Sequence, residues 1–200
     1  MKAIFSILFL ATLLFGASDE QSIKEDYLKS YNYEQMGKYK EAIKVLSPLY
    51  TKYPKGYTIN FRLGWLFFLN KKYTNAIKHY KAASLVNTKA IDPRLGLIRS
   101  YLAKNSYKKS ETIANEILKI DFYNYYTNYY MIQTLRAEKK YDIAQEVCIK
   151  MLALYPTDIL FLEQLARIYK VSKSPYLEQL YKDILILDPN NIFVNLQMPK

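Results

Sequence analysis

The amino-acid sequence predicts an all-α protein, a right-handed solenoid of about five helix pairs that follows a short apolar leader. Similar segments recur every 34 residues, which is the spacing of a repeated two-helix unit. Glycine and proline are scarce, at 5 and 7 of 200 residues, which argues against a turn-rich β-sandwich. Apolar residues make up 50% of the chain, enough to build the continuous core of one repeat array.

The leader occupies residues 1–18 and has the pattern of a secretory signal peptide. A short basic start is followed by the uncharged run AIFSILFLATLLF at residues 3–15, which is too short to span a bilayer comfortably and makes a membrane anchor the less favoured alternative. Small residues at 16–18 (GAS) are suited to cleavage before Asp19, and no cysteine follows as a lipoprotein signal would need. We therefore expect export to the periplasm or beyond. Cleavage would leave 28 basic against 18 acidic residues, a net charge of +10.

The repeat is clearest in the segments GKYKEAIKVL, KKYTNAIKHY and KKYDIAQEVC. A tyrosine recurs at 34-residue intervals, as Tyr39, Tyr73, Tyr107 and Tyr141. A small residue recurs in the same register, as Ala42, Ala76, Ser110 and Ala144. A strict period in two residue types indicates one structural unit repeated along the chain.

With these features the sequence resembles the tetratricopeptide repeat family, whose period is 34 residues. The second repeat carries Leu63-Gly64, Phe67, Ala76 and Ala83 at the family's characteristic positions. The predicted repeats are 23–56, 57–90, 91–124, 125–158 and 159–191, with 192–200 as a tail or partial cap. Two departures are Lys29-Ser30 in place of Leu-Gly in the first repeat and Phe122 in place of proline in the third.

The resemblance implies two antiparallel helices, A and B, in each repeat, whose apolar stripes are buried only when neighbouring pairs stack. The recurring small residue lets helix B lie close to helix A, and the recurring tyrosine begins helix B. The fifth repeat loses one residue near Pro175 and ends in the closing turn LDPNN.

The sequence contains few residues of the types that commonly act in catalysis. The one histidine, His79, is expected on the outer, solvated side of a helix B, and the one cysteine, Cys148, is expected in the core. Glu41, Glu111 and Glu146 are expected to face solvent without converging. No phosphate-binding glycine loop, paired-cysteine metal motif or zinc-protease motif is present in the sequence. We therefore predict a protein that is not an enzyme and holds no cofactor or metal.

Binding is the remaining function class. In relatives that hold ligands in the concave groove, positions 2, 5, 9, 12 and 13 of helix A face the ligand. Carried onto this sequence, the candidate groove residues are Tyr27, Tyr31, Phe61, Trp65, Arg99, Tyr126, Tyr129, Arg136, Arg167 and Lys170. The groove is thus aromatic in its first half and cationic in its second. Such a surface suits an extended segment of another envelope protein with acidic or carboxylate groups and apolar anchors.

The segment DFYNYYTNYYMIQ, at residues 121–133, holds six aromatic rings. The repeat register assigns Tyr125 and Tyr130 to packing between helices and only Tyr126 and Tyr129 to the groove. It also makes Asn124 a candidate helix cap.

Two alternatives stay open. A carbohydrate-binding module for peptidoglycan or exopolysaccharide would use Tyr126, Tyr129 and Trp65 as stacking faces. Electrostatic association with an envelope complex or an anionic membrane surface would use the charge of +10. Nucleic acid is the less favoured anion, because an A+T-rich genome would by itself raise the lysine and tyrosine contents together, so neither content alone indicates nucleic-acid binding.

Overall fold

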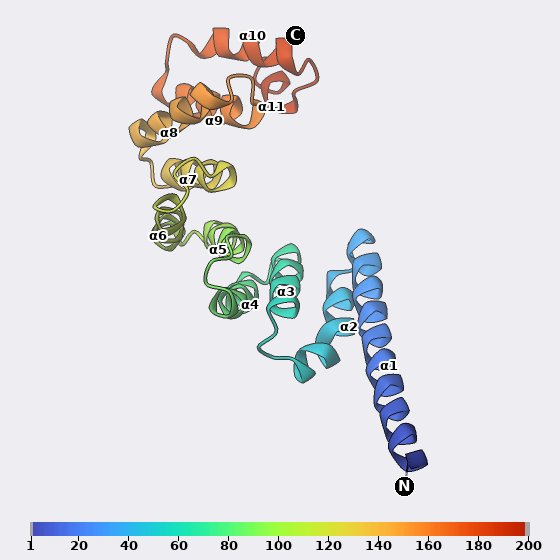
Figure 1. Cartoon of the computed structure of the whole chain (residues 1–200). Helices are drawn as coiled ribbons and strands as arrows, with labels where there is room; N and C mark the ends of the chain where they lie inside the picture. The colour runs from blue at the N-terminus through green and yellow to red at the C-terminus, as the bar shows by residue number, and fades with distance from the viewer. Residues whose placement is uncertain (1, 199–200) are drawn as a thin grey trace. The chain divides into compact units, whose positions relative to one another are not determined.

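The structure is a computed structural model that describes residues 2–198, with side chains described from Asp19 onward. The described residues form eleven helices and no strand (Figure 1). The helices are α1 (Lys2–Gln35), α2 (Tyr39–Lys52), α3 (Tyr57–Leu69), α4 (Tyr73–Val86), α5 (Asp92–Ala103), α6 (Tyr107–Leu118), α7 (Tyr125–Ala137), α8 (Tyr141–Leu154), α9 (Ile159–Ser172), α10 (Leu177–Leu187) and α11 (Ile192–Asn195). They pack as consecutive neighbours, so the all-α prediction of stacked helix pairs is confirmed.

The chain divides into two compact units, one ending at Gly96 and one beginning at Leu97. In unit 1, α2 packs between α1 and α3, and α3 packs on α4. Ala42 and Leu46 of α2 meet Leu63 and Leu66 of α3 in a core that excludes water. The small side chain of Ala42 allows this close approach, as the sequence predicts.

Two glycines of unit 1 make room for the fully buried ring of Tyr80. A Cβ atom on Gly64 would lie 2.7 Å from the ring, and one on Gly96 would lie 2.4 Å from it. Both distances are far inside van der Waals contact, so only glycine allows the ring to lie directly against these two helix backbones. The Leu-Gly signature of the second repeat thus has a direct packing role.

In unit 2, helices α6 to α10 pack each on the next. Ser110 on α6 and Ala144 on α8 are fully buried at the small-residue positions. Ser110 Oγ lies 2.9 Å from Thr134 Oγ1, and this hydroxyl donates in turn to Tyr130 O, so the polar atom of Ser110 is satisfied inside the core.

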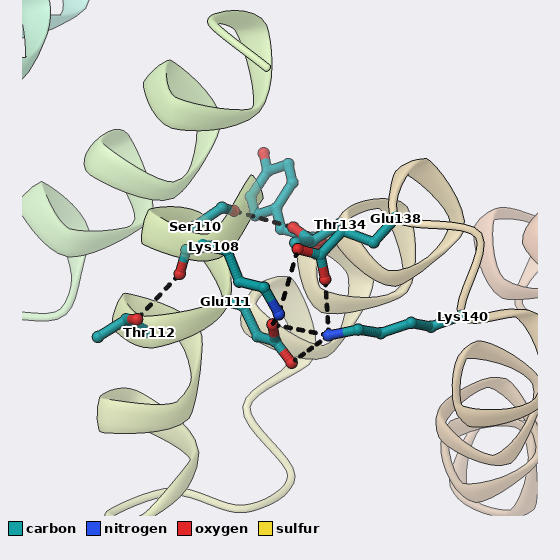
Figure 2. A network of polar contacts seen from close by, with 8 residues as sticks. Lys108, Ser110, Glu111, Thr112, Thr134, Glu138 and Lys140 are labelled. Carbon is teal, nitrogen blue, oxygen red and sulfur yellow. Dashed lines mark hydrogen bonds and ion pairs between the residues drawn. The ribbon is translucent and has the colours of Figure 1, made fainter. Parts of the chain in front are cut away.

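A charged network next to this pair joins α6 to the start of α8 (Figure 2). Lys140 Nζ lies 3.0 Å from Glu111 and 2.7 Å from Glu138, and Lys108 lies within 4 Å of both carboxylates. These contacts raise the pKa of Lys140 above its ordinary value and lower that of Glu111. The prediction that Glu111 faces solvent without converging on another acid is therefore wrong.

Each turn between the two helices of a pair contains one residue in the left-handed conformation. These residues are Gly37, Lys71, Asn105, Lys139 and Lys173. Each follows the one before it by 34 positions. The backbone conformation at this position is therefore the same in every pair, although only glycine and asparagine favour it.

His79 is also placed differently from the prediction. Its side chain is buried, and the ring packs between Phe67, 5.2 Å away between centroids, and Tyr50, 5.0 Å away. Its Nδ1 lies 2.9 Å from Asn60 Oδ1. The outer-face assignment is wrong because aromatic neighbours on both α2 and α3 cover this side of α4. Cys148, in contrast, is fully buried as predicted, and burial raises the pKa of its thiol to about 12.

Both ends of the helix array continue into further helical structure. The backbone of α1 runs as one helix from the leader into the first helix A. In the part of the chain that the structure describes, no helix has both the length and the apolar content needed to span a membrane. At the other end, α11 buries Val194, so the segment after Asn191 partly covers the last pair. Residues 199–200 of the predicted cap lie outside the described range.

Candidate binding site

The ten candidate groove residues fall into both units. Tyr27, Tyr31, Phe61 and Trp65 belong to unit 1, and the other six, on helices α5, α7 and α9, belong to unit 2. The two sets are described separately.

The unit 1 residues lie around one carboxylate, Glu34 of α1. Trp65 Nε1 donates to Glu34 Oε1 over 2.6 Å, and the Arg62 guanidinium forms an ion pair with the same carboxylate. Arg62 also lies 3.9 Å from the centroid of the Tyr31 ring, as a cation–π contact. We name Tyr31, Glu34, Arg62 and Trp65 the Glu34 cluster.

The aromatic half of the predicted groove is therefore occupied to a large extent by contacts within the protein. Phe61 stacks on Tyr57 and contacts Tyr80, at centroid distances of 6.1 and 6.0 Å. Tyr27 is half-buried, and this burial raises the pKa of its hydroxyl. Arg62 is the residue that sequence reasoning missed: it lies at position 6 of its helix, next to the groove positions, and it is buried because Glu34 neutralises it.

In unit 2, α7 and α9 enclose two adjoining hollows of about 640 and 840 Å³. Both are lined by Arg136, Glu163, Arg167 and Val171. The first also includes Tyr129, and the second includes Lys170 and the chain from Asp188 to Gln197. We name Tyr129, Arg136, Glu163, Arg167 and Lys170 the arginine hollow. The structure thus brings together four of the ten predicted residues.

Arg136 is the most unusual charge in the arginine hollow. Its Nη1 donates to a neutral acceptor, Gln164 Oε1, at 2.6 Å, and its buried Nε has no hydrogen-bond partner among the described residues. No carboxylate of the described residues lies within ion-pair distance of it. Burial and the like charge of Arg167 lower its pKa from the ordinary value. Arg136 therefore carries a half-buried charge that the protein itself does not neutralise.

The two other cations of the hollow have partners. Arg167 lies 3.3 Å from Glu163, one helical turn away, and 3.8 Å from the centroid of the Phe193 ring. Glu163 accepts a second hydrogen bond from Asn191 at 2.9 Å, and Lys170 donates to Gln197. The segment around α11 therefore forms one wall of the hollow, a role that the sequence did not indicate for Phe193 and Gln197.

Electrostatically the arginine hollow has an excess of positive charge. Tyr129 adds an aromatic wall whose hydroxyl has a pKa raised by burial and by Tyr130 and Glu163, and therefore stays protonated as a hydrogen-bond donor. An anionic group that enters between Tyr129 and Arg136 would find a donor on one side and an unneutralised guanidinium on the other.

Two predicted residues lie elsewhere. Tyr126 is 57% exposed and its ring packs edge-on to Tyr125 at 5.1 Å, outside both hollows. Arg99 lies on α5 and lines neither hollow. Tyr125 packs against Phe161 and Tyr155 and donates to Asp158, consistent with its predicted place between helices. Asn124 accepts from the Thr127 N–H as the predicted cap of α7.

Among the described residues, no group of three or more His, Cys, Asp or Glu side chains is arranged so that it could bind a metal ion.

Three solved structures with this arrangement of helices were found among those that match. A tetratricopeptide repeat protein from Parabacteroides merdae aligns with a TM-score of 0.75 and 19% identity, over 88% of this chain and 70% of its own. MamA from Desulfovibrio magneticus RS-1 aligns with a TM-score of 0.73 and 12% identity, over 86% and 97%. A thermophilic TPR protein from Thermus thermophilus aligns with a TM-score of 0.67 and 12% identity, over 87% and 95%.

No family model matches the sequence, and no curated protein matches it. The structural likeness shows that the chain has the tetratricopeptide repeat fold, as its 34-residue period predicts. This fold is typical of scaffolds for protein–protein interaction.

Proposed function

We propose that this tetratricopeptide repeat protein is an exported, non-enzymatic adaptor that binds an extended, acidic segment of another envelope protein in the arginine hollow. The observation that carries the proposal is the half-buried charge of Arg136, which no carboxylate of the described residues neutralises. Tyr129, Arg167 and Lys170 surround it with a ring and two further cations. A partner carboxylate next to an apolar side chain would fit this combination.

The export part of the proposal rests on the leader at residues 1–18. Asp19 is the first residue after the predicted cleavage point. Its carboxylate forms a salt bridge with Lys52 of α2, at a distance of 2.6 Å. Cleavage there would keep this link between the start of the mature chain and α2. N-terminal sequencing of the protein from a periplasmic or culture fraction tests it: the expected first residue is Asp19, and an uncleaved Met1 in every fraction would contradict export by this route.

The binding part is tested by site-specific crosslinking. A photoreactive residue at Gln133, which lines the hollow beside Tyr129 and Arg136, should crosslink one predominant envelope protein. Arg136→Gln should reduce its capture by about tenfold or more, as expected for a desolvated arginine at an interface. A matched control, Lys109→Gln, alters an exposed lysine of α6 outside the hollow and should have little effect. Equal capture by wild type and Arg136→Gln would contradict the proposal.

The carbohydrate alternative receives less support. It requires Trp65 and the tyrosines of α7 as open stacking faces. Trp65 donates a hydrogen bond to Glu34. Of the two tyrosines, Tyr129 lines a hollow, whereas Tyr126 packs against Tyr125 outside it. The salt dependence of binding distinguishes the alternative of association through net charge alone, because the affinity of such association falls by orders of magnitude between low and moderate salt. Binding at Arg136 should persist, since a buried charge is screened less.

A further inference from the structure

A third hollow, of about 720 Å³, lies on the opposite side of α7 from the arginine hollow. Asn128, Met131 and Leu135 of α7 line it, whereas Tyr129, Gln133 and Arg136 face the arginine hollow. These two sets occupy opposite sides of a helix with a period of about 3.6 residues. We name the space between α6 and α8 above these residues the α6/α8 furrow.

The furrow has an apolar floor and a basic end. Its apolar residues are Leu118, Phe122, Met131, Leu135, Ile143 and Val147. Lys119 and Lys150 lie toward the C-terminal ends of α6 and α8. Glu111 belongs to the network with Lys140 and is neutralised there (Figure 2).

Lys150, like Lys119 and Glu146, is a charged group of the furrow that has no ion-pair partner among the described residues. Its Nζ donates to Asn128 Oδ1 at 2.6 Å and lies 4.0 Å from the centroid of the Phe122 ring. No carboxylate of the described residues pairs with it, and burial lowers its pKa. Asn128 itself is fixed, because its amide donates to Phe122 O and Asn124 O at 3.0 and 2.9 Å. The ammonium is thus held by a rigid neutral acceptor beside an aromatic ring.

Phe122 replaces the proline that ends the first and fourth repeats, and it is 55% exposed. Its ring lines the furrow beside Lys150 and is in edge contact, at 5.0 Å, with the ring of Tyr123, whose centroid lies 5.8 Å from Lys150 Nζ. An apolar side chain that lay against Met131 and Val147 could therefore be covered by Phe122 while an anion reached Lys150.

We propose that the α6/α8 furrow binds the free C-terminus of a partner polypeptide that ends in a bulky apolar residue. The terminal carboxylate pairs with Lys150, and the last side chain lies on the apolar floor. A peptide suits the furrow better than an aliphatic acid, because Asn115, Glu111 and Glu146 on its walls offer acceptors to backbone N–H groups. This site is separate from the arginine hollow and does not depend on it.

The test uses two pools of N-acetylated hexapeptides with Leu, Ile, Val, Met or Phe at the last two positions, one with a free carboxylate and one amidated. Binding to the mature chain is followed through the methyl NMR signals of Met131 and Ile143. The free-acid pool should shift both signals, and the amidated pool should bind at least about tenfold more weakly. Lys150→Met should reduce the affinity for the free-acid pool to that for the amidated pool. Lys109→Met and Arg136→Gln should leave the affinity for the free-acid pool unchanged.

Five results would overturn the proposal. Equal binding of the two pools, or no shift with either, would show that the furrow does not recognise a terminal carboxylate. Preference for the acid that survives Lys150→Met would place the anion elsewhere. Tighter binding of decanoate than of the peptide pool, with the same dependence on Lys150, would assign the furrow to an aliphatic acid. Loss of the free-acid preference in Arg136→Gln alone would locate the ligand in the arginine hollow.

Discussion

Asn60 in unit 1 and Asn128 in unit 2 occupy the same position of the repeat and make the same backbone contacts, but their further surroundings differ. Each side-chain amide donates to the carbonyls six and four residues before it, at 2.8–3.0 Å. Beyond that, Asn60 Oδ1 meets the buried ring of His79, and Asn128 Oδ1 meets the ammonium of Lys150 in the open furrow. One shared geometry thus supports a closed aromatic core in one unit and an exposed, charged hollow in the other.

The difference shows that one repeat position can be part of a buried core in one unit and lie beside an open hollow in the other. At Asn60, the partner is neutral, and Tyr50 and Phe67 pack against its ring, which is buried. At Asn128, the partner is charged, and the rings that lie against it, Phe122 and Tyr123, are themselves exposed. The asparagine fixes the turn before helix A in both cases, and the residue on the next helix B decides whether the junction is closed or open.

The largest expected effect is a loss of stability in acid that depends on His79. Burial lowers its pKa from 6.5 to about 4, and the charge of Lys78 adds to this. The unfolded chain therefore binds the proton more strongly than the folded chain between pH 6.5 and 4, so stability falls as the pH falls through this window. At pH 4 the loss in the free energy of unfolding that is due to His79 amounts to about 3 kcal/mol.

Urea unfolding at several pH values, for wild type and His79→Gln, measures this effect. Glutamine can still donate to Asn60 but does not titrate, so the variant keeps the losses that come from carboxylates and lacks the contribution of His79. The free energy of unfolding of wild type should drop by about 3 kcal/mol more than that of the variant between about pH 7 and pH 4. Parallel pH profiles would show that the ring is not held neutral.

The second effect comes from the asparagines themselves. Asn60→Ala should cost about 3 kcal/mol, because it leaves the Pro54 carbonyl and the buried His79 Nδ1 without a partner, whereas the Gly56 carbonyl keeps the backbone N–H of residue 60. Asn128→Ala should cost less, about 1.5 kcal/mol, because Lys150 can turn to water in the open furrow. Hydrogen exchange of α3 and α7 measures the two losses locally. Equal losses would mean that the furrow is as closed as the unit 1 core.

The sequence predicted the part of this comparison that depends on the repeat. The period identified the fold, and Ala42, Ser110 and Ala144 are buried as their register requires. Asn60 and Asn128 lie in the same register, and their shared position was a signal that sequence reasoning did not use. The partners on the next helix B could not be predicted, because His79 and Lys150 occupy different positions of their repeats.

The candidate groove was predicted less completely for a related reason. Four residues chosen by their position in helix A, Tyr129, Arg136, Arg167 and Lys170, line the two adjoining hollows of unit 2. Position could not show that Glu34 engages Trp65, since that contact depends on two side-chain rotamers in neighbouring helices. Nor could it show that Phe193, from the predicted tail, lies on Arg167.

A third and smaller effect concerns Lys150. Lys150→Met should change the free energy of unfolding by less than about 1 kcal/mol, because the lost hydrogen bond to Asn128 is offset by removal of an unpaired, half-buried charge. Thermal unfolding followed by circular dichroism measures it. A loss above about 2 kcal/mol would assign Lys150 to the stability of unit 2 and weaken its role as a binding group.

The smallest effect tests whether the two units are equivalent where their backbones are the same. Lys71 in unit 1 and Lys139 in unit 2 both adopt the left-handed conformation, with φ of 57° and 62°. Glycine avoids the steric cost of this conformation but loses more backbone entropy on folding, so Lys71→Gly and Lys139→Gly should each stabilise by about 0.5 kcal/mol. Urea unfolding of the two variants and of Gly37→Lys, expected to show the opposite sign, measures this. Because all three turns are alike, a gain confined to one unit would mean that the units differ in their turns as well as in the residues that meet Asn60 and Asn128.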